Sequence, residues 1–213
     1  MKNLRILSMN LGRRFVPIKD KGKREYITDF IKEEGYDIVM LQGNGVGRNS
    51  FFKNLGYDYT DSSKDVITLV SNRTIVESKV TDVLNCSIIS NIDRPVMLVN
   101  VNYKNLKNID ELFDVCDIYS KEKDVHYVRS RIIAGRFPKA FNMNEFCDQF
   151  NLDDISSLVG QDMHIKNNRE MVNHFFISRN LEALSVHKLV GMTEVSGIGE
   201  AYPIEVTLKK VLK

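Results

Sequence analysis

Residues 36–44, with the sequence YDIVMLQGN, decide the fold of this chain. They begin with a short apolar run of the kind found in a buried strand. Residues 4–9 read as another strand, and residues 22–34 between the two read as a helix that Gly35 ends. The buried face of this helix should consist of Tyr26, Ile27, Phe30 and Ile31.

The rest of the chain continues to alternate strands with a few helices. Segments rich in Val, Ile and Leu predict further strands at residues 65–71, 74–84, 96–103, 128–134, 171–177 and 203–209, with a weaker one at 183–190. Helices are expected at residues 48–54, at 109–121, where Asn108 is the expected N-cap, and at 143–150. Without repeats or an obvious linker, this pattern predicts one α/β domain over residues 1–213, a two-sheet β-sandwich flanked by helices.

Composition and charge are those of an ordinary globular protein. The 30 Lys and Arg nearly balance the 28 Asp and Glu, giving a net charge of +2, which does not indicate a nucleic-acid partner, although a local basic patch could still bind one. No apolar run approaches the roughly 20 residues that span a bilayer. The start Met-Lys-Asn leads directly into the first expected strand. We therefore expect no signal peptide, no membrane contact and a cytoplasmic protein.

The three cysteines, Cys86, Cys116 and Cys147, are odd in number and widely spaced. This spacing disfavours a disulfide framework and a cysteine-based zinc site. We expect reduced and mostly buried thiols.

Five segments, taken in order, resemble the landmarks of the endonuclease/exonuclease/phosphatase (deoxyribonuclease I-like) superfamily. They are residues 4–12 (LRILSMNLG), 36–44 (YDIVMLQGN), 97–103 (MLVNVNY), 131–138 (RIIAGRFP), and 171–177 (MVNHFFI) together with 199–204 (GEAYPI). At the first and third places the family has strands that end in a metal-site Asn and in a His, respectively. At the second and fourth it has the motifs PDIxxLQE and IxxGDFN. At the fifth it has a strand with an internal Asp, followed later by SDHxP. The resemblance spans nearly the whole chain and implies the deoxyribonuclease I-like four-layer fold.

The resemblance also locates the family's catalytic positions, and nearly all of them are replaced here. Asn10 matches the metal-site Asn, whereas Gly43 stands where the family has its metal-binding Glu. The other replacements are Asn102 for the His of the third landmark, Arg136 and Pro138 for the Asp and Asn of GDFN, Asn173 for the buried Asp, and Glu200 and Ala201 for the terminal Asp–His pair. Metal-assisted phosphoester cleavage needs oxygen ligands for Mg²⁺ or Mn²⁺ and a general base, and an arginine cannot act as that base.

These replacements predict a catalytically inactive relative of metal-dependent phosphoesterases, without a metal or other cofactor. The ligand-binding candidates in the remnant cleft are Asn10, Gln42, Asn44, Asn102, Arg136, Asn173 and Glu200. The partner would be a phosphate-bearing ligand or another protein, while a cleft filled by its own side chains would leave an interaction module. The alternative is a divergent Mg²⁺- or Mn²⁺-dependent phosphodiesterase or nuclease with relocated groups.

Arg136 brings a positive charge to the place of an acid, and three arrangements follow. It could pair with Glu200 across the cleft, which we favour because an unpaired buried arginine is costly. It could instead bind an anion directly, since a guanidinium matches phosphate oxygens. In the third arrangement the loop from Gly135 to Phe141 has shifted and Arg136 points to solvent.

Other features carry weaker functional hypotheses. The glycine-rich loop at residues 43–47 has backbone amides that could cradle a phosphate, but a plain flexible loop is favoured because the Lys-Ser/Thr ending of a P-loop is missing. The basic stretch at residues 13–24 should be a solvated loop before the first helix. Among the histidines, His126, His164 and His187 are scattered. His174 follows Asn173 in a strand and should lie on the opposite face, in the core or on the outer face of the sheet.

Overall fold

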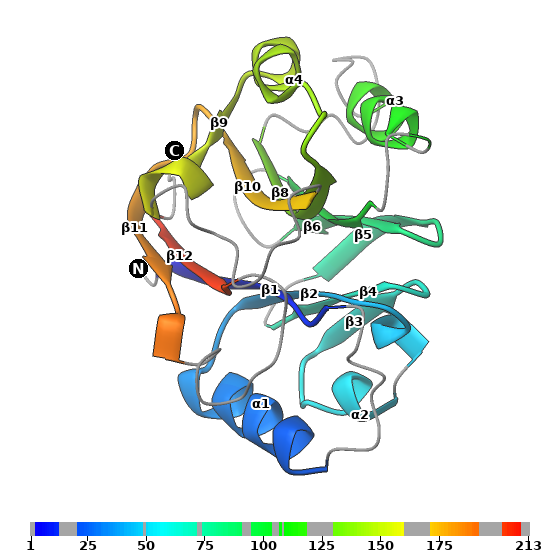
Figure 1. Ribbon diagram of the computed structural model, residues 1–213, viewed down its shortest axis with the longest axis vertical. Coiled ribbons are helices and arrows are strands. Elements are labelled where there is room, and N and C mark those ends of the chain that lie inside the picture. The colour runs from blue at the N-terminus through cyan, green and yellow to red at the C-terminus, as the bar shows by residue number, and fades with distance from the viewer. Residues whose placement is uncertain are drawn as a thin grey trace.

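The structure, a computed structural model, describes residues 3–12, 21–48, 50–71, 74–90, 95–103, 107, 109–118, 130–159, 171–191 and 202–209. In these ranges two six-stranded sheets pack face to face (Figure 1). Helices α1 (Lys21–Glu34) and α2 (Ser50–Lys53) cover the outer face of the first sheet. Helices α3 (Asp110–Ile118) and α4 (Met143–Phe150) cover the outer face of the second sheet (Figure 1). These four layers confirm the helix-flanked two-sheet sandwich that the sequence predicts.

The first sheet places the ends of two motif strands side by side. Its strands are, in spatial order, β11 (Ala183–Lys188), β12 (Ile204–Leu208), β1 (Leu4–Asn10), β2 (Ile38–Gln42), β4 (Val66–Val70) and β3 (Tyr59–Ser62). β1 and β2 are parallel because α1 carries the chain back between them, and the other pairs are antiparallel. In the parallel pair Asn10 lies opposite Gln42.

The second sheet aligns three more of the candidate residues. Its strands are, in spatial order, β5 (Thr74–Val80), β6 (Leu84–Ser90), β7 (Val96–Asn102), β8 (Ser130–Pro138), β10 (Met171–Ser178) and β9 (Leu152–Asp154). β7 and β8 are parallel, and the remaining pairs are antiparallel. Arg136 lies opposite Asn102 on one side and opposite Asn173 on the other.

Helix α1 shows how a short sequence pattern fixes an element. Ile27 and Ile31, one turn apart, are both fully buried and pack on Leu7 and Leu41 of the first sheet. Tyr26 was expected on the same face, but it is 38% exposed, because it lies about 100° around the helix from Ile27. Gly35 follows the helix with a φ of 61°, a conformation that suits glycine.

Helix α4 is defined by its caps. The Asn142 side chain accepts a hydrogen bond from the Glu145 backbone N–H at 3.3 Å and donates one to the Glu145 carboxylate at 2.8 Å. Phe146 and Phe150 bury the inner side of the helix against the second sheet. The expected helix at residues 143–150 is thereby confirmed.

Several element boundaries differ from the sequence-based expectation. The strand expected at residues 74–84 ends at Val80, where a turn closed by a 2.8 Å bond from the Thr81 N–H to the Leu84 carbonyl leads into β6. The helix expected at 48–54 is a 3₁₀ turn, η1 (Val46–Arg48), followed by α2. β8 runs on to Pro138, past the end expected at residue 134. The short strands β3 and β9 were not predicted, and neither was β6, of which only Leu84 falls within an expected strand.

The cysteines, the basic stretch and the helix hydropathy were also predicted from the sequence. Cys86 and Cys116 are free and buried, and Cys147 is free and half-buried, which agrees with reduced thiols. Within the basic stretch, Lys21 to Arg24 form the first turn of α1 and are not part of a loop, while residues 13–20 and the expected cap Asn108 lie outside the described residues. In the described part of the chain no helix is long and apolar enough to cross a membrane.

Candidate functional site

The space between the two sheets is apolar at one end and polar at the other. Toward the starts of β1 and β2 it is filled by side chains such as Ile6, Ile38 and Leu98. Toward the ends of β1, β2, β7 and β8, alternate positions on the same strand faces carry polar side chains. The exposed fractions of these residues are 0% for Gln42 and Asn100, 2% for Asn10 and Asn102, 3% for Arg136 and 6% for Asn173. This buried polar end is the candidate site.

Asn10 and Asn173 join the two sheets at this end. The Asn10 side-chain N–H donates to the carboxamide oxygen of Asn173 at 3.2 Å. The carboxamide oxygen of Asn10 accepts the Gly12 backbone N–H at 2.8 Å, which fixes the orientation of the amide. Two residues 163 positions apart in sequence, each selected by its motif, therefore meet directly.

Gln42 lies deeper and is held by Asn100, which the sequence reading missed. The Gln42 amide nitrogen donates to the Asn100 side-chain oxygen at 2.8 Å and to the Met40 carbonyl at 3.0 Å. Asn100 in turn donates to the Ile67 carbonyl at 2.9 Å. A signal was present, because Asn100 precedes Asn102 by two positions and so shares its strand face. Gln42 is fully buried, and its bond to Asn100 ties the two sheets together.

Arg136 occupies the middle of the cross-strand row Asn102–Arg136–Asn173. It is 3% exposed, so the arrangement in which it points to solvent is wrong. Asn102 donates to the Asp65 carbonyl at 3.5 Å. Glu200 lies outside the described residues, and so does any pairing between Glu200 and Arg136.

The glycine-rich loop that follows β2 uses its own amides. The N–H groups of Gly43 and Gly45 donate to the backbone carbonyl and the carboxylate of Asp65, both at 2.9 Å. The next three amides are also bonded within the protein: Val46 to the Gly43 carbonyl, Gly47 to that of Lys64 and Arg48 to that of Gly45. Asn44, a binding candidate, is exposed, and its N–H donates to the Gly12 carbonyl. The loop therefore does not form a phosphate cradle.

Among the described residues, the motif positions lack the carboxylates that usually hold a divalent metal. Mg²⁺ is normally held through one or two carboxylates, and the described side chains of the site are carboxamides and a guanidinium. Gly43 has a φ of 154°, and a Cβ atom placed there would lie 3.3 Å from the Gly12 carbonyl and from the Leu11 Cβ. A carboxylate side chain at this position would therefore need the backbone to adjust. In the described ranges no group of three or more His, Cys, Asp or Glu could hold a metal ion.

His174 lies on the opposite face from Asn173, as the strand alternation predicts. Its Nδ1 is 2.8 Å from the Asp154 carboxylate, and its ring stacks on Phe176. Burial by itself would raise the pKa of the Asp154 carboxyl, but hydrogen bonds with His174 and Ser156 hold it below its ordinary value. On the outer face of the sheet, this pair therefore ties β10 to its neighbouring strand β9. Of the other histidines, His187 lies on β11, and His126 and His164 are outside the described residues.

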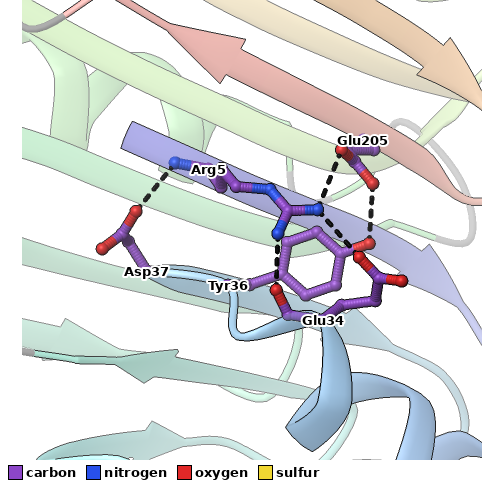
Figure 2. Close-up of polar contacts among 5 residues, drawn as sticks. All are labelled: Arg5, Glu34, Tyr36, Asp37 and Glu205. Atoms are coloured by element: carbon purple, nitrogen blue, oxygen red, sulfur yellow. Dashed lines mark hydrogen bonds and ion pairs between the residues drawn. The ribbon is translucent and has the colours of Figure 1, made fainter. Parts of the chain in front are cut away.

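A second polar network lies at the other end of β1 and was not predicted. Figure 2 shows the Arg5 guanidinium bonded to the carboxylates of Glu34 at 3.0 Å and Glu205 at 3.2 Å. The guanidinium also lies over the Tyr36 ring, 4.9 Å from its centre, and the Tyr36 hydroxyl donates to Glu205 at 2.8 Å. These contacts join α1, β1, the start of β2 and β12. We call them the Arg5 network.

Comparisons with known proteins support the fold. Neither a protein-family model nor a curated protein sequence matches the chain. Among solved structures, the human Nocturnin catalytic domain with bound sulfate anion superposes with a TM-score of 0.68 at 13% identity, covering 98% of this chain and 95% of that one. An endonuclease/exonuclease/phosphatase family protein from Bacteroides thetaiotaomicron gives 0.67 at 14% identity, with 100% and 99% covered.

A mannosyl-6-phosphatase from Bacteroides thetaiotaomicron VPI-5482 is also similar, with a TM-score of 0.62 at 15% identity and 97% and 99% of the two chains covered. At such low identity the likeness concerns the course of the backbone. Together with the order of the five sequence landmarks, these superpositions show that the chain has the fold of the endonuclease/exonuclease/phosphatase superfamily.

Proposed function

We propose that this chain is a catalytically inactive relative of the metal-dependent phosphoesterases that binds a phosphate-bearing ligand at its buried polar end. The observation that carries the proposal is the row Asn102–Arg136–Asn173, in which a guanidinium is flanked by two carboxamides. Arg136 is 3% exposed and lies where the family resemblance implies an acid. A cation there changes the preferred ligand from a metal ion to an anion.

The chemistry of the row suits anion binding. A guanidinium has five N–H donors in a planar fork that matches phosphate oxygens. Asn10 of the first sheet donates to Asn173, the neighbour of Arg136 in the second sheet, and this hydrogen bond orients both amides. The Nocturnin structure supports the proposal by analogy, since that protein has the same fold and was solved with a sulfate anion, which resembles phosphate in shape and charge.

The same residues argue against turnover. Hydrolysis of a phosphoester needs a general base and, in this family, a metal ion. Gly43 supplies no ligand, and Arg136 replaces the acid that the GDFN motif would bring.

A protein partner that presents a phosphorylated residue would use the same contacts.

The proposal is tested by titrating inorganic phosphate into the protein by calorimetry. We expect saturable binding that weakens by at least about tenfold in Arg136→Met, since the loss of a charge-assisted contact is worth roughly 1.5–3 kcal/mol. Arg131→Met is the matched control, because Arg131 is a buried arginine of the same strand that lies on its outer face. Equal binding by the two variants would contradict the proposal.

Metal binding and activity separate this function from its alternative. We expect no manganese binding tighter than about 100 μM and no turnover of bis-p-nitrophenyl phosphate, DNA or RNA above background. Activity that copurifies with the protein and falls at least about tenfold in Asn10→Ala would establish a divergent phosphodiesterase or nuclease instead.

A further inference from the structure

A small pocket lies at the end of the first sheet that is remote from Asn10. It has a volume of about 200 Å³ and sits where α1 ends, β2 begins and β4 ends. Its walls include the apolar side chains of Ile31 and Leu55, the rings of Tyr36 and Tyr57, the carboxylate of Asp37 and, from the last turn of α1, the exposed Lys32. The proposed phosphate site makes no use of these residues.

Asp37 is the acidic residue of the pocket. It is only 6% exposed, and one of its oxygens accepts the Arg5 backbone N–H at 2.9 Å. Figure 2 shows the other oxygen turned away from Arg5. Backbone bonds fix the residue, since its N–H donates to the Arg5 carbonyl and its carbonyl accepts the Ser71 N–H, both at 2.9 Å. An ionised carboxylate offers about four acceptor positions, so further donors can be bound.

Two other features make the pocket attractive to a cation. Burial and then the charge of Asp37 raise the pKa of the Tyr57 phenol, so Tyr57 stays neutral and its hydroxyl oxygen can accept a hydrogen bond. The pocket also adjoins the C-terminal end of α1, where the helix dipole places partial negative charge. The carboxylate, the phenol and the helix terminus favour positive charge, while Lys32, which also lines the pocket, is exposed and keeps its own charge hydrated at the rim.

The Arg5 network shows that this region of the protein already holds an organic cation. The Arg5 guanidinium lies on the ring of Tyr36, binds the Glu34 carboxylate and donates to the Glu34 backbone carbonyl at the end of α1 (Figure 2). An aromatic ring, a carboxylate and the helix end are thus the components that bind Arg5. The pocket presents the same components next to it, with Asp37 in place of Glu34 and Tyr57 in place of the Tyr36 ring.

We propose that this pocket binds a small organic cation, an alkylammonium or guanidinium group, between Asp37 and Tyr57. The apolar walls would take the adjoining methylene groups. The volume suits a group the size of a lysine side-chain end and excludes a drug-sized molecule, which needs at least about 300 Å³. The cation could belong to a free amine or to a side chain of another protein.

The test is an NMR titration of the ¹⁵N-labelled protein with n-propylammonium chloride, with n-propanol as the uncharged probe of equal size. We expect saturable shifts of the Gly35, Gly56 and Tyr57 amide signals, with a dissociation constant in the millimolar range. Propanol should cause no saturable shift. Equal binding of the two probes, or no saturable shift with propylammonium, would overturn the proposal.

Variants locate the charge that is responsible. Asp37→Asn keeps an oxygen for the Arg5 N–H and should weaken propylammonium binding by at least about tenfold, the loss expected for a charge-assisted hydrogen bond. Glu33→Gln is the control, since it removes one acid from the same end of α1 without touching the pocket. If Asp37→Asn does not fold, Tyr57→Phe takes its place, with a several-fold loss expected. Unchanged affinity in the folded variant would reject the site.

A second probe identifies the source of the cation. N-acetyl-lysinamide carries the same ammonium group on a protein-like side chain. Binding as tight as that of propylammonium would show that a lysine of a partner protein can enter the pocket. Binding of propylammonium alone would assign the pocket to a free amine.

Discussion

The two ends of β1, which we call the Arg5 end and the Asn10 end, are built from different kinds of polar residue. At the start of the strand, Arg5 binds the carboxylates of Glu34 and Glu205. At its last residue, Asn10 binds the neutral carboxamide of Asn173. The Arg5 network is partly hydrated, with 31% of the Arg5 side chain and 44% of the Glu34 side chain exposed, whereas Asn10 is 2% exposed.

This difference follows from the cost of removing charge from water. A charged group that keeps part of its hydration can join a network at little cost, while a buried ion loses several kcal/mol of hydration unless it is well paired. Neutral carboxamides have a smaller penalty and satisfy both donor and acceptor roles. Arg136 is the exception, because it brings a charge into the Asn10 end, where the other buried polar side chains are neutral carboxamides. We propose that a binding role explains this charge.

The largest effect in this comparison should come from the backbone of the Asn10 end. Gly135 precedes Arg136 with a φ of 140°, and a Cβ atom there would lie 2.0 Å from the Val101 carbonyl oxygen. We expect Gly135→Ala to reduce the free energy of unfolding by about 3 kcal/mol or more, because two paired strands must move apart. Urea unfolding followed by circular dichroism measures this loss.

Gly56→Ala is the matched control for Gly135→Ala. Gly56 also has a positive φ, 81°, but a Cβ atom there would meet nothing within 4 Å. It should cost only the backbone strain, about 1–2 kcal/mol. Equal losses in the two variants would show that close strand contact is not what holds the Asn10 end.

Gln42→Met should be the next largest effect. The substitution keeps the volume of the side chain but leaves the Asn100 carboxamide oxygen without its 2.8 Å donor. We expect a loss of about 2 kcal/mol in the free energy of unfolding, and the same loss at high salt because no charge is involved. Asn44 is exposed and lies two positions after Gln42, so Asn44→Ala should change the free energy of unfolding by less than about 0.5 kcal/mol. A loss for Gln42→Met as small as that would contradict the buried amide network.

The Asn10 end could be predicted from the sequence largely because its residues belong to recognisable motifs. Asn10, Gln42, Asn102, Arg136 and Asn173 each lie at a fixed place relative to a strand, and strand alternation then puts them on the inner faces. Asn100 was overlooked although the same alternation places it there. Position alone did not show how deeply each side chain lies, so exposed Asn44 and fully buried Gln42 were grouped together.

The Arg5 end could not be predicted, because its contacts depend on the register between distant strands. Arg5 and Glu205 are 200 positions apart, and nothing near either residue in sequence marks the pair. Boundaries failed for a related reason. The residues from Val80 to Leu84 have a strand-like composition, yet a turn falls among them because β5 and β6 must pair with each other.

Glu205→Gln tests the charged character of the Arg5 end. The variant keeps a hydrogen-bond acceptor for Tyr36 but removes the charge that faces Arg5 at 3.2 Å. We expect a loss of about 1 kcal/mol in the free energy of unfolding at 0.1 M salt. This loss should shrink in 1 M NaCl, because the Debye length falls from about 10 Å to about 3 Å. If the loss in free energy of unfolding does not change with salt, charge does not hold the Arg5 end together, and the two ends of β1 do not differ in this respect.

Tyr36→Phe should give an effect at neutral pH as small as that of Glu205→Gln, and the most characteristic pH dependence. Burial and then the hydrogen bond to Glu205 raise the pKa of the Tyr36 phenol far above its ordinary value near 10. A raised pKa in the folded state means that the contribution of Tyr36 to stability is fully present below about pH 10 and is lost above it, where the unfolded chain ionises first. At pH 7 the variant should lose about 1 kcal/mol through the missing bond to Glu205.

Above pH 10 the wild-type protein should lose stability faster than Tyr36→Phe, by up to about 1.4 kcal/mol per pH unit, so the two unfolding curves should converge and then cross. Other buried tyrosines, such as Tyr103, titrate in both proteins and therefore cancel in the difference. Urea unfolding of both proteins at pH 7, 10 and 11 measures the crossing. At the other end of β1, the difference between wild type and Gln42→Met should stay constant over the same pH range, since neither residue ionises. Parallel curves for wild type and Tyr36→Phe would mean that the phenol of the folded protein ionises as readily as that of the unfolded chain, and the Arg5 network would then not protect it from water.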